Sequence, residues 1–270
     1  MAGIVQQGHG TPIVLVPGIQ GRWEWMAPKI DALAVHGRAI TYSLCDEPTS
    51  GFPWAKERGF ENYVAQLDDV LTTIDARRPV LIGVSYGGLV AAEFAARHPH
   101  RVAGLVIASA PPPNWTPDRR VQRYLAAPRL LGAAFFLGAP LRTYPELKAA
   151  FPSMSARLRF ALAQGLRVVT APPSSGRMAR RLQWLQQAHF ELHRPLDLPA
   201  LVVTGEPGLE RVVPPDLTAE YLAWLPRARA VTMSGTGHAG TVTRSREFAA
   251  LVGEFAAALG ATHAPETRTA

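Results

Sequence analysis

The feature that most constrains the fold is a serine set between glycines where an apolar strand passes into a helix. The run Gly83-Val-Ser-Tyr-Gly87 overlaps the end of the apolar segment 80–84 and leads into residues 86–97, which have helical spacing. A side chain at such a junction stands on a sharp turn clear of the sheet, and flanking glycines let neighbouring backbone pass without Cβ clashes. The pattern predicts an accessible hydroxyl on Ser85.

Short apolar runs alternate with amphipathic helical stretches along most of the chain. This alternation is typical of the α/β class, with a mostly parallel central sheet and helices on both faces. The spacing predicts a helix after Asn62, which we expect to cap it, and others over 86–97 and about 244–259. Strands are expected at 13–16, 39–44, 80–84, 102–108, 201–204 and 228–233.

One segment interrupts the alternation. From the proline run 111–113 to Pro195 there is no convincing strand, only helical stretches separated by prolines. We interpret residues 112–195 as an inserted helical cap. Residues 1–111 and 196–260 would then form the core domain, and 261–270 a flexible tail.

The composition favours a substantial core. The sequence has 270 residues, 47% of them apolar and 18% charged, which argues against long disorder. The net charge is +7, and residues 112–195 hold 13 basic and three acidic residues. These charges are scattered and lack the aromatic and glycine pattern of an RNA-binding module, so nucleic acid is not expected as a partner.

The location is expected to be cytoplasmic. Cys45 is the only cysteine, which suits a reducing compartment. The N-terminal segment lacks a basic stretch followed by an apolar run. The longest apolar stretch, 130–141, is broken by glycines and a proline and is too short to cross a bilayer.

Four motifs together resemble the α/β-hydrolase superfamily. They read VLVPGIQG, LIGVSYGG, LVVTGE and SGTGHAG in this order, and the resemblance spans about residues 11 to 260. It points to the cofactor-free branch that includes esterases, lactonases, lipase-like enzymes and C–C bond hydrolases. The resemblance implies an α/β-hydrolase fold with a helical cap, no cofactor and a small-molecule, largely apolar substrate. The oligomeric state is left open.

The resemblance assigns roles to four residues. Ser85 would be the nucleophile and His238, after the last strand, its general base, because a serine hydroxyl attacks well only when a neutral imidazole takes its proton. The backbone N–H groups of Ile19 and Tyr86 would form the oxyanion hole. Many relatives carry His-Gly where this chain has Pro17-Gly18, a change that leaves the backbone role intact.

The acid is less directly indicated. The family pattern Gly-x-x-Asp-x-x-x-Pro does not fit forward from Gly205, because the fourth position is Gly208. Counting back from Pro214 gives Glu210, which fits if the turn is two residues longer. Glu can orient imidazole as Asp does. The alternatives that stay open are Glu206 and Asp216.

Other residues suggest a pocket but no metal. The candidate pocket residues are Trp23, Trp25, Phe135 and Phe136; packing is an equal alternative for the tryptophans and the favoured one for either phenylalanine taken alone. Cap arginines could meet a substrate carboxylate, although most are expected to be solvated. No His-x-x-x-His, cysteine cluster or Asp-rich loop points to a metal.

Taken together, the sequence predicts a serine hydrolase of the carboxylic ester type, working through an acyl-enzyme with a Ser-His-Glu triad. The alternatives are a C–C bond hydrolase of diketone acids, a non-catalytic small-ligand receptor of the same fold, and an acyltransferase. Because serine occupies the turn, the dehalogenase and epoxide hydrolase chemistries that use Asp there are not expected.

Overall fold

A computed structural model describes residues 3–128, 130–132, 138–192 and 194–261, and it is built around one seven-stranded sheet. The strand order is β1-β3-β2-β4-β5-β6-β7, and every neighbouring pair is parallel except β1 with β3. The expected mostly parallel α/β sheet is confirmed. The strands are β1 (Ile4–Gln7), β2 (Pro12–Val16), β3 (Arg38–Tyr42), β4 (Val80–Val84), β5 (Gly104–Ala108), β6 (Ala200–Gly205) and β7 (Ala228–Met233).

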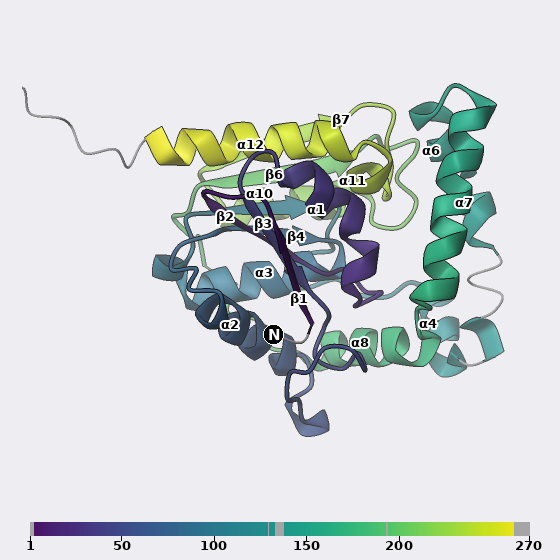
Figure 1. The fold of residues 1–270 in the computed structure, drawn as a ribbon. Coiled ribbons are helices and arrows are strands. Elements are labelled where there is room, and N and C mark those ends of the chain that lie inside the picture. Colours follow the sequence, from purple (N-terminus) through teal and green to yellow (C-terminus); the bar gives the residue numbers. More distant parts are fainter. Residues whose placement is uncertain (1–2, 129, 133–137, 193, 262–270) are drawn as a thin grey trace, which may run out of the picture.

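Helices cover both faces of the sheet, which explains why its central strands are apolar on both sides. On one face, Ile13 and Leu15 pack in the cluster of α1 (Ala27–Leu33) and α12 (Ser245–Ala261). On the other face, Val14 and Val16 join the cluster of α2 (Glu61–Thr73) and α3 (Tyr86–Arg97). Figure 1 shows these two helical layers on opposite sides of the strands.

The segment expected to form the cap contains the helices between β5 and β6. They are α4 (Arg119–Ala126), α6 (Ala139–Ala150), α7 (Met154–Thr170) and α8 (Ser175–Gln187). Three of these helices have an N-cap whose side chain accepts a hydrogen bond from an amide of the first turn. The N-caps are Asp118 for α4, Ser153 for α7 and Ser174 for α8. Helix α7 lies along the outer edge of the molecule (Figure 1). Leu158 and Leu162, which lie on one face of this helix, are exposed to solvent.

Two local expectations are corrected. Strand β1 was not expected, because Gln6 and Gln7 interrupt the apolar pattern of this short antiparallel edge strand. Asn62 does not cap α2 but lies inside it, and its side chain both accepts from the amide and donates to the carbonyl of Ala55.

The remaining elements are short. They are η1 (Trp23–Trp25), η2 (Lys56–Arg58), η3 (Pro99–Arg101), α9 (Pro215–Ala219), α10 (Tyr221–Trp224) and α11 (Gly240–Thr243). Among the residues described, no helix has the length and hydropathy needed to cross a bilayer.

Candidate active site

Ser85 occupies a strained turn between β4 and α3. Its φ is 55° and its ψ is −125°, a conformation that costs a non-glycine residue about 1–3 kcal/mol and persists only where the surroundings enforce it. Two backbone hydrogen bonds do so here. The Ser85 amide donates to the carbonyl of Ala108 at 2.9 Å, and its carbonyl accepts from the amide of Gly88 at 2.8 Å.

The glycines around Ser85 allow three backbone segments to meet. A Cβ on Gly83 would lie 2.4 Å from the Cα of Gly88, and one on Gly87 would lie 2.5 Å from the carbonyl oxygen of Val16. The loop after β2 therefore runs directly against the start of α3. Within that loop, a Cβ on Gly18 would be 3.9 Å from the Cβ of Ser85.

His238 reaches Ser85 from the other end of the chain. It lies in the turn between β7 and α11, and its Nε2 is 3.1 Å from the Ser85 Oγ. This is hydrogen-bonding distance for a base that takes the proton of a hydroxyl. The opposite ring nitrogen, Nδ1, points toward Glu210.

Glu210 supplies a buried carboxylate beside the imidazole. Its Oε1 lies 3.3 Å from His238 Nδ1 and accepts the amides of Val212 and Val213 at 2.9 and 3.1 Å. The contact with Nδ1 is electrostatic rather than an aligned hydrogen bond, since neither His238 Nδ1 nor Glu210 Oε2 forms one with any residue described. Burial acts to raise the pKa of Glu210, but His238 and the two amides outweigh it and lower that pKa below its ordinary value.

The two alternative acids lie elsewhere. Glu206 is engaged with the amide of Gly235, which donates to its Oε1 at 3.0 Å. Asp216 lies in the first turn of α9. Within the described part of the chain, neither carboxylate contacts the imidazole, so the structure brings Glu210 to the site and leaves the other two outside it.

The expected oxyanion hole has two available donors. Tyr86 is the first residue of α3, so its amide has no partner within the helix. Ile19 follows Gly18 in the loop against Ser85. Neither amide donates a hydrogen bond to another described residue.

Sequence reasoning missed Glu146, a cap residue beside the histidine loop. It lies in α6 and is only 3% exposed, and its Oε2 accepts the amide of Ala239 at 3.1 Å. Burial raises the pKa of Glu146 above its ordinary value, although the amides of Gly237 and Ala239 oppose the shift. The sequence does single out Glu146 in one respect, since it is one of only three acidic residues in residues 112–195.

Most arginines of the predicted cap were expected to be solvated, and Arg181 is an exception. This residue of α8 has no exposed surface, and its Nη1 donates to the Ile19 carbonyl at 2.7 Å. The rest of its guanidinium pairs with Asp46 and Glu47. Those adjacent acids, just after β3, were the sequence signal for a buried basic partner.

The pocket candidates are only partly placed. The indole N–H of Trp25 donates to the carbonyl of Ala171, 3.0 Å away at the end of α7, so this ring joins η1 to the helical segment between β5 and β6. Trp23 is half-buried, and its amide donates to Ser43 Oγ at 3.2 Å. Phe135 and Phe136 lie outside the described residues. Cys45 is buried.

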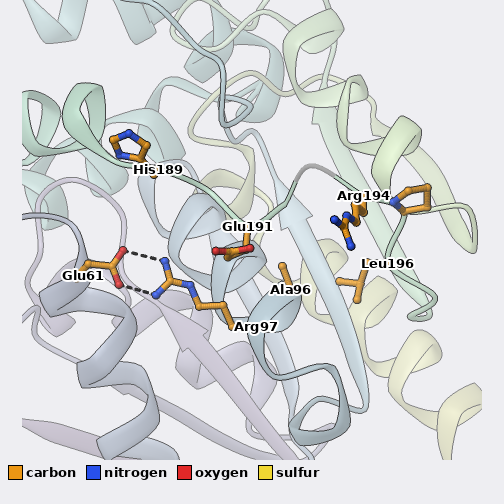
Figure 2. Close-up of a pocket in the computed structure, with 8 residues that line it drawn as sticks. Glu61, Ala96, Arg97, His189, Glu191, Arg194 and Leu196 are labelled. Atoms are coloured by element: carbon orange, nitrogen blue, oxygen red, sulfur yellow. Dashed lines mark hydrogen bonds and ion pairs between the residues drawn. The ribbon is translucent and has the colours of Figure 1, made fainter.

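A surface groove of about 760 Å³ lies away from this site. It is at the C-terminal end of α3, where Arg97 is held by both oxygens of Glu61 (Figure 2). Ser85 precedes the opposite end of this 12-residue helix, about 18 Å away at 1.5 Å per residue. Because Ser85 is distant from this groove, we do not assign the chemistry to it. The described residues contain no group of three or more His, Cys, Asp or Glu side chains placed to hold a metal ion.

Comparison with known proteins adds a family match. Residues 11–244 match the family described as alpha/beta hydrolase fold. The chain is 31% identical over 209 residues to the pimeloyl-(acyl-carrier protein) methyl ester esterase of Neisseria meningitidis serogroup B, covering 71% of this chain and 73% of that protein. It is 34% identical over 109 residues to the 2-hydroxy-6-oxo-2,4-heptadienoate hydrolase of Pseudomonas putida, a match that covers 38% of each chain.

Solved structures share the fold at low sequence identity. An esterase from Exiguobacterium antarcticum superposes with a TM-score of 0.76 at 17% identity, covering 94% of both chains. The enol-lactonase from Burkholderia xenovorans LB400 has a TM-score of 0.71 at 18% identity, covering 94% of this chain and 95% of that one.

Proposed function

The chain belongs to the α/β-hydrolase fold family, and we propose that it is a serine hydrolase that cleaves an ester, a lactone or a similar carbonyl substrate through an acyl-enzyme. The observation that carries this proposal is the 3.1 Å approach of His238 Nε2 to the hydroxyl of a serine held at φ 55°. A strained, half-buried nucleophile with a base in reach is the arrangement that acyl transfer requires.

In the proposed reaction, the Ser85 hydroxyl attacks the substrate carbonyl while His238 Nε2 takes its proton. The imidazolium then gives that proton to the leaving alcohol, which departs and leaves an acyl group on Ser85. Water attacks the acyl-enzyme with His238 again as the base, and Ser85 is regenerated. Glu210 would stabilise the imidazolium in both steps, because its carboxylate lies 3.3 Å from Nδ1.

The negative charge on the carbonyl oxygen needs donors fixed in advance. We assign this role to the amide of Tyr86, which follows Ser85, and to that of Ile19, which follows Gly18 in the loop beside Ser85. Donors of this kind contribute about 3–4 kcal/mol each to the transition state.

The partial likeness to the 2-hydroxy-6-oxo-2,4-heptadienoate hydrolase favours a second candidate, cleavage of a C–C bond in a diketone acid. Such a substrate carries a carboxylate that needs a cationic partner. The cap arginines Arg177, Arg180 and Arg181 are already paired with acidic residues, so they do not serve this purpose. The match to the methyl ester esterase covers 71% of this chain and the match to the C–C bond hydrolase only 38%, so the ester or lactone reaction is our first choice.

The test is covalent labelling with a fluorophosphonate, combined with turnover of short-chain nitrophenyl esters. We expect the wild type to be labelled and active, and Ser85→Ala to be unlabelled and to lose at least about 10³-fold in kcat. Ser109→Ala is the matched control, since this buried serine also ends a strand at positive φ. It should keep both labelling and turnover. Equal labelling of wild type and Ser85→Ala would refute the proposal.

The same panel separates the candidates. Turnover of esters or lactones without cleavage of ring-fission diketone acids supports the first function. Cleavage of the diketone acids alone would replace it with the second.

A further inference from the structure

Arg181 is a charged cap side chain that ends inside the core, next to the proposed oxyanion loop. It is among the largest side chains with no exposed surface in the described chain. Its Nη1 donates to the Ile19 carbonyl at 2.7 Å, its Nε to Asp46 Oδ1 at 3.1 Å and its Nη2 to Glu47 Oε1 at 2.6 Å. One guanidinium thus joins α8, the loop after β3 and the loop after β2.

Two neighbouring arginines also pair with Asp46 and Glu47. Arg180 Nη2 binds the other oxygen of Asp46 at 2.9 Å, and Arg177 Nη2 binds the other oxygen of Glu47 at 2.9 Å. Buried ion clusters add little net stability, because desolvation offsets the attraction, and apolar replacements often do as well. Stability alone therefore does not account for an arginine at this position.

The loop itself is shaped around the guanidinium. The amide of Gly21 donates to the carbonyl of Gly18 at 2.9 Å, which closes a turn with Ile19 inside it. Gly21 has φ 77°, and a Cβ there would lie 2.3 Å from Arg181 Nη1. A side chain at position 21 would occupy the space that the guanidinium now fills.

We propose that Arg181 is a positioning residue that sets the oxyanion hole by fixing the carbonyl, and with it the backbone, of Ile19. The Ile19 N–H belongs to the preceding peptide, so holding the following carbonyl restricts rotation of the residue that links the two. The donor is then aimed only when α8 is docked on the core. This inference rests on the proposed function, because it concerns a donor used in that reaction.

The test compares Arg181→Lys with Arg180→Ala. The lysine keeps the charge but not the planar set of donors that spans Ile19 and both acids. Arg180 is the matched control, because it pairs with Asp46 and lies over the rings of Trp54 and Trp184 without touching Ile19. Measurements are kcat and KM per titrated active site, inhibition by an alkylboronic acid, and the melting temperature.

For Arg181→Lys we expect kcat to fall about 10–100-fold with KM within about threefold. The inhibition constant of the boronic acid should rise by a similar factor, because its tetrahedral adduct uses the same donors. Arg180→Ala should stay within about threefold in kcat and in boronate inhibition, whatever its melting temperature. A purely structural arginine would alter the melting temperature without this pattern.

The outcomes separate this inference from the proposed function. If Ser85 of the wild type is not labelled by a fluorophosphonate, the proposed function fails and this inference with it. If labelling and turnover are present but Arg181→Lys matches Arg180→Ala in kcat and boronate inhibition, only the inference is overturned. Should Arg181→Lys not fold, Arg181→Gln keeps a side-chain N–H donor without the full guanidinium and must show the same fall in kcat at constant KM.

Discussion

Replacing Glu210 with glutamine isolates the electrostatic part of its proposed role. Glutamine keeps an oxygen that can accept the amides of Val212 and Val213, which Glu210 Oε1 now binds. At 3.3 Å and an effective dielectric constant of about 20, a carboxylate and an imidazolium attract each other by about 5 kcal/mol. The side chain of His238 is 24% exposed, and water screens the pair, so the expected loss is smaller, about 10²–10³-fold in kcat.

The assay is steady-state turnover of a short-chain ester, with the rate of fluorophosphonate labelling as a second readout. KM should stay within about threefold, because the charge forms on the imidazole only in the transition state. Glu206→Gln is the matched control and should stay within about threefold in kcat, since Glu206 contacts Gly235 and not the imidazole. The assignment is wrong if Glu210→Gln keeps more than about a tenth of kcat, or if Glu206→Gln costs more.

The pH dependence of stability gives the same variant an independent readout. The pKa of Glu210 is lower in the folded protein than its ordinary value, so its ionised form stabilises the fold. That contribution is fully present above the unfolded pKa, near 4.3 (about the ordinary value for Glu), and is lost as the pH falls through the folded value. The difference in melting temperature between wild type and Glu210→Gln should therefore be largest at neutral pH and shrink toward about pH 3.

Variants at two further sites, Lys29 and Glu146, test buried charged groups. Burial lowers the pKa of Lys29 to about 7. Keeping this amine charged in the folded protein therefore destabilises the fold. The destabilisation is absent above the ordinary lysine pKa near 10.5, grows as the pH falls and is complete below about 7. Lys29→Met should raise the melting temperature at pH 6, by about 2–4 °C for each kcal/mol gained, and a gain that persists at about pH 11 would contradict this reasoning. Glu146→Ala removes the acceptor of the Ala239 amide and should lower kcat about tenfold and stability by about 1–3 kcal/mol in chemical denaturation. Glu146→Gln keeps an acceptor and should do less harm, and equal effects of the two variants would exclude this account.

Local patterns predicted most of the sheet and the layers around it. The continuous apolar runs 13–16 and 80–84 became β2 and β4, because strands buried on both faces carry little else. Strand β1 was not predicted, because its two glutamines leave no continuous apolar run. Its pairing with β3, rather than its own composition, makes this segment a strand.

For the site, the sequence placed the residues whose position follows from the ends of strands. Ser85 and His238 were chosen in this way, and the structure brings them together across 153 residues. Their catalytic roles stay predictions. For Glu146 and Arg181 the sequence held a signal but not the partner, because their contacts join residues 93 and 162 positions apart and leave no local periodicity to read.

The contacts between the inserted helices and the loops of the proposed active site bear on how members of this fold family can be recombined. A cap inserted between two strands looks like a module that could be exchanged to change substrate preference while the sheet is kept. Here that segment also carries the side chains that grip the Ile19 carbonyl and the Ala239 amide. A chimera that joins a foreign cap to this core would lose both hydrogen bonds and leave Asp46 and Glu47 buried without their arginines. Only a cap with equivalent side chains would avoid this loss.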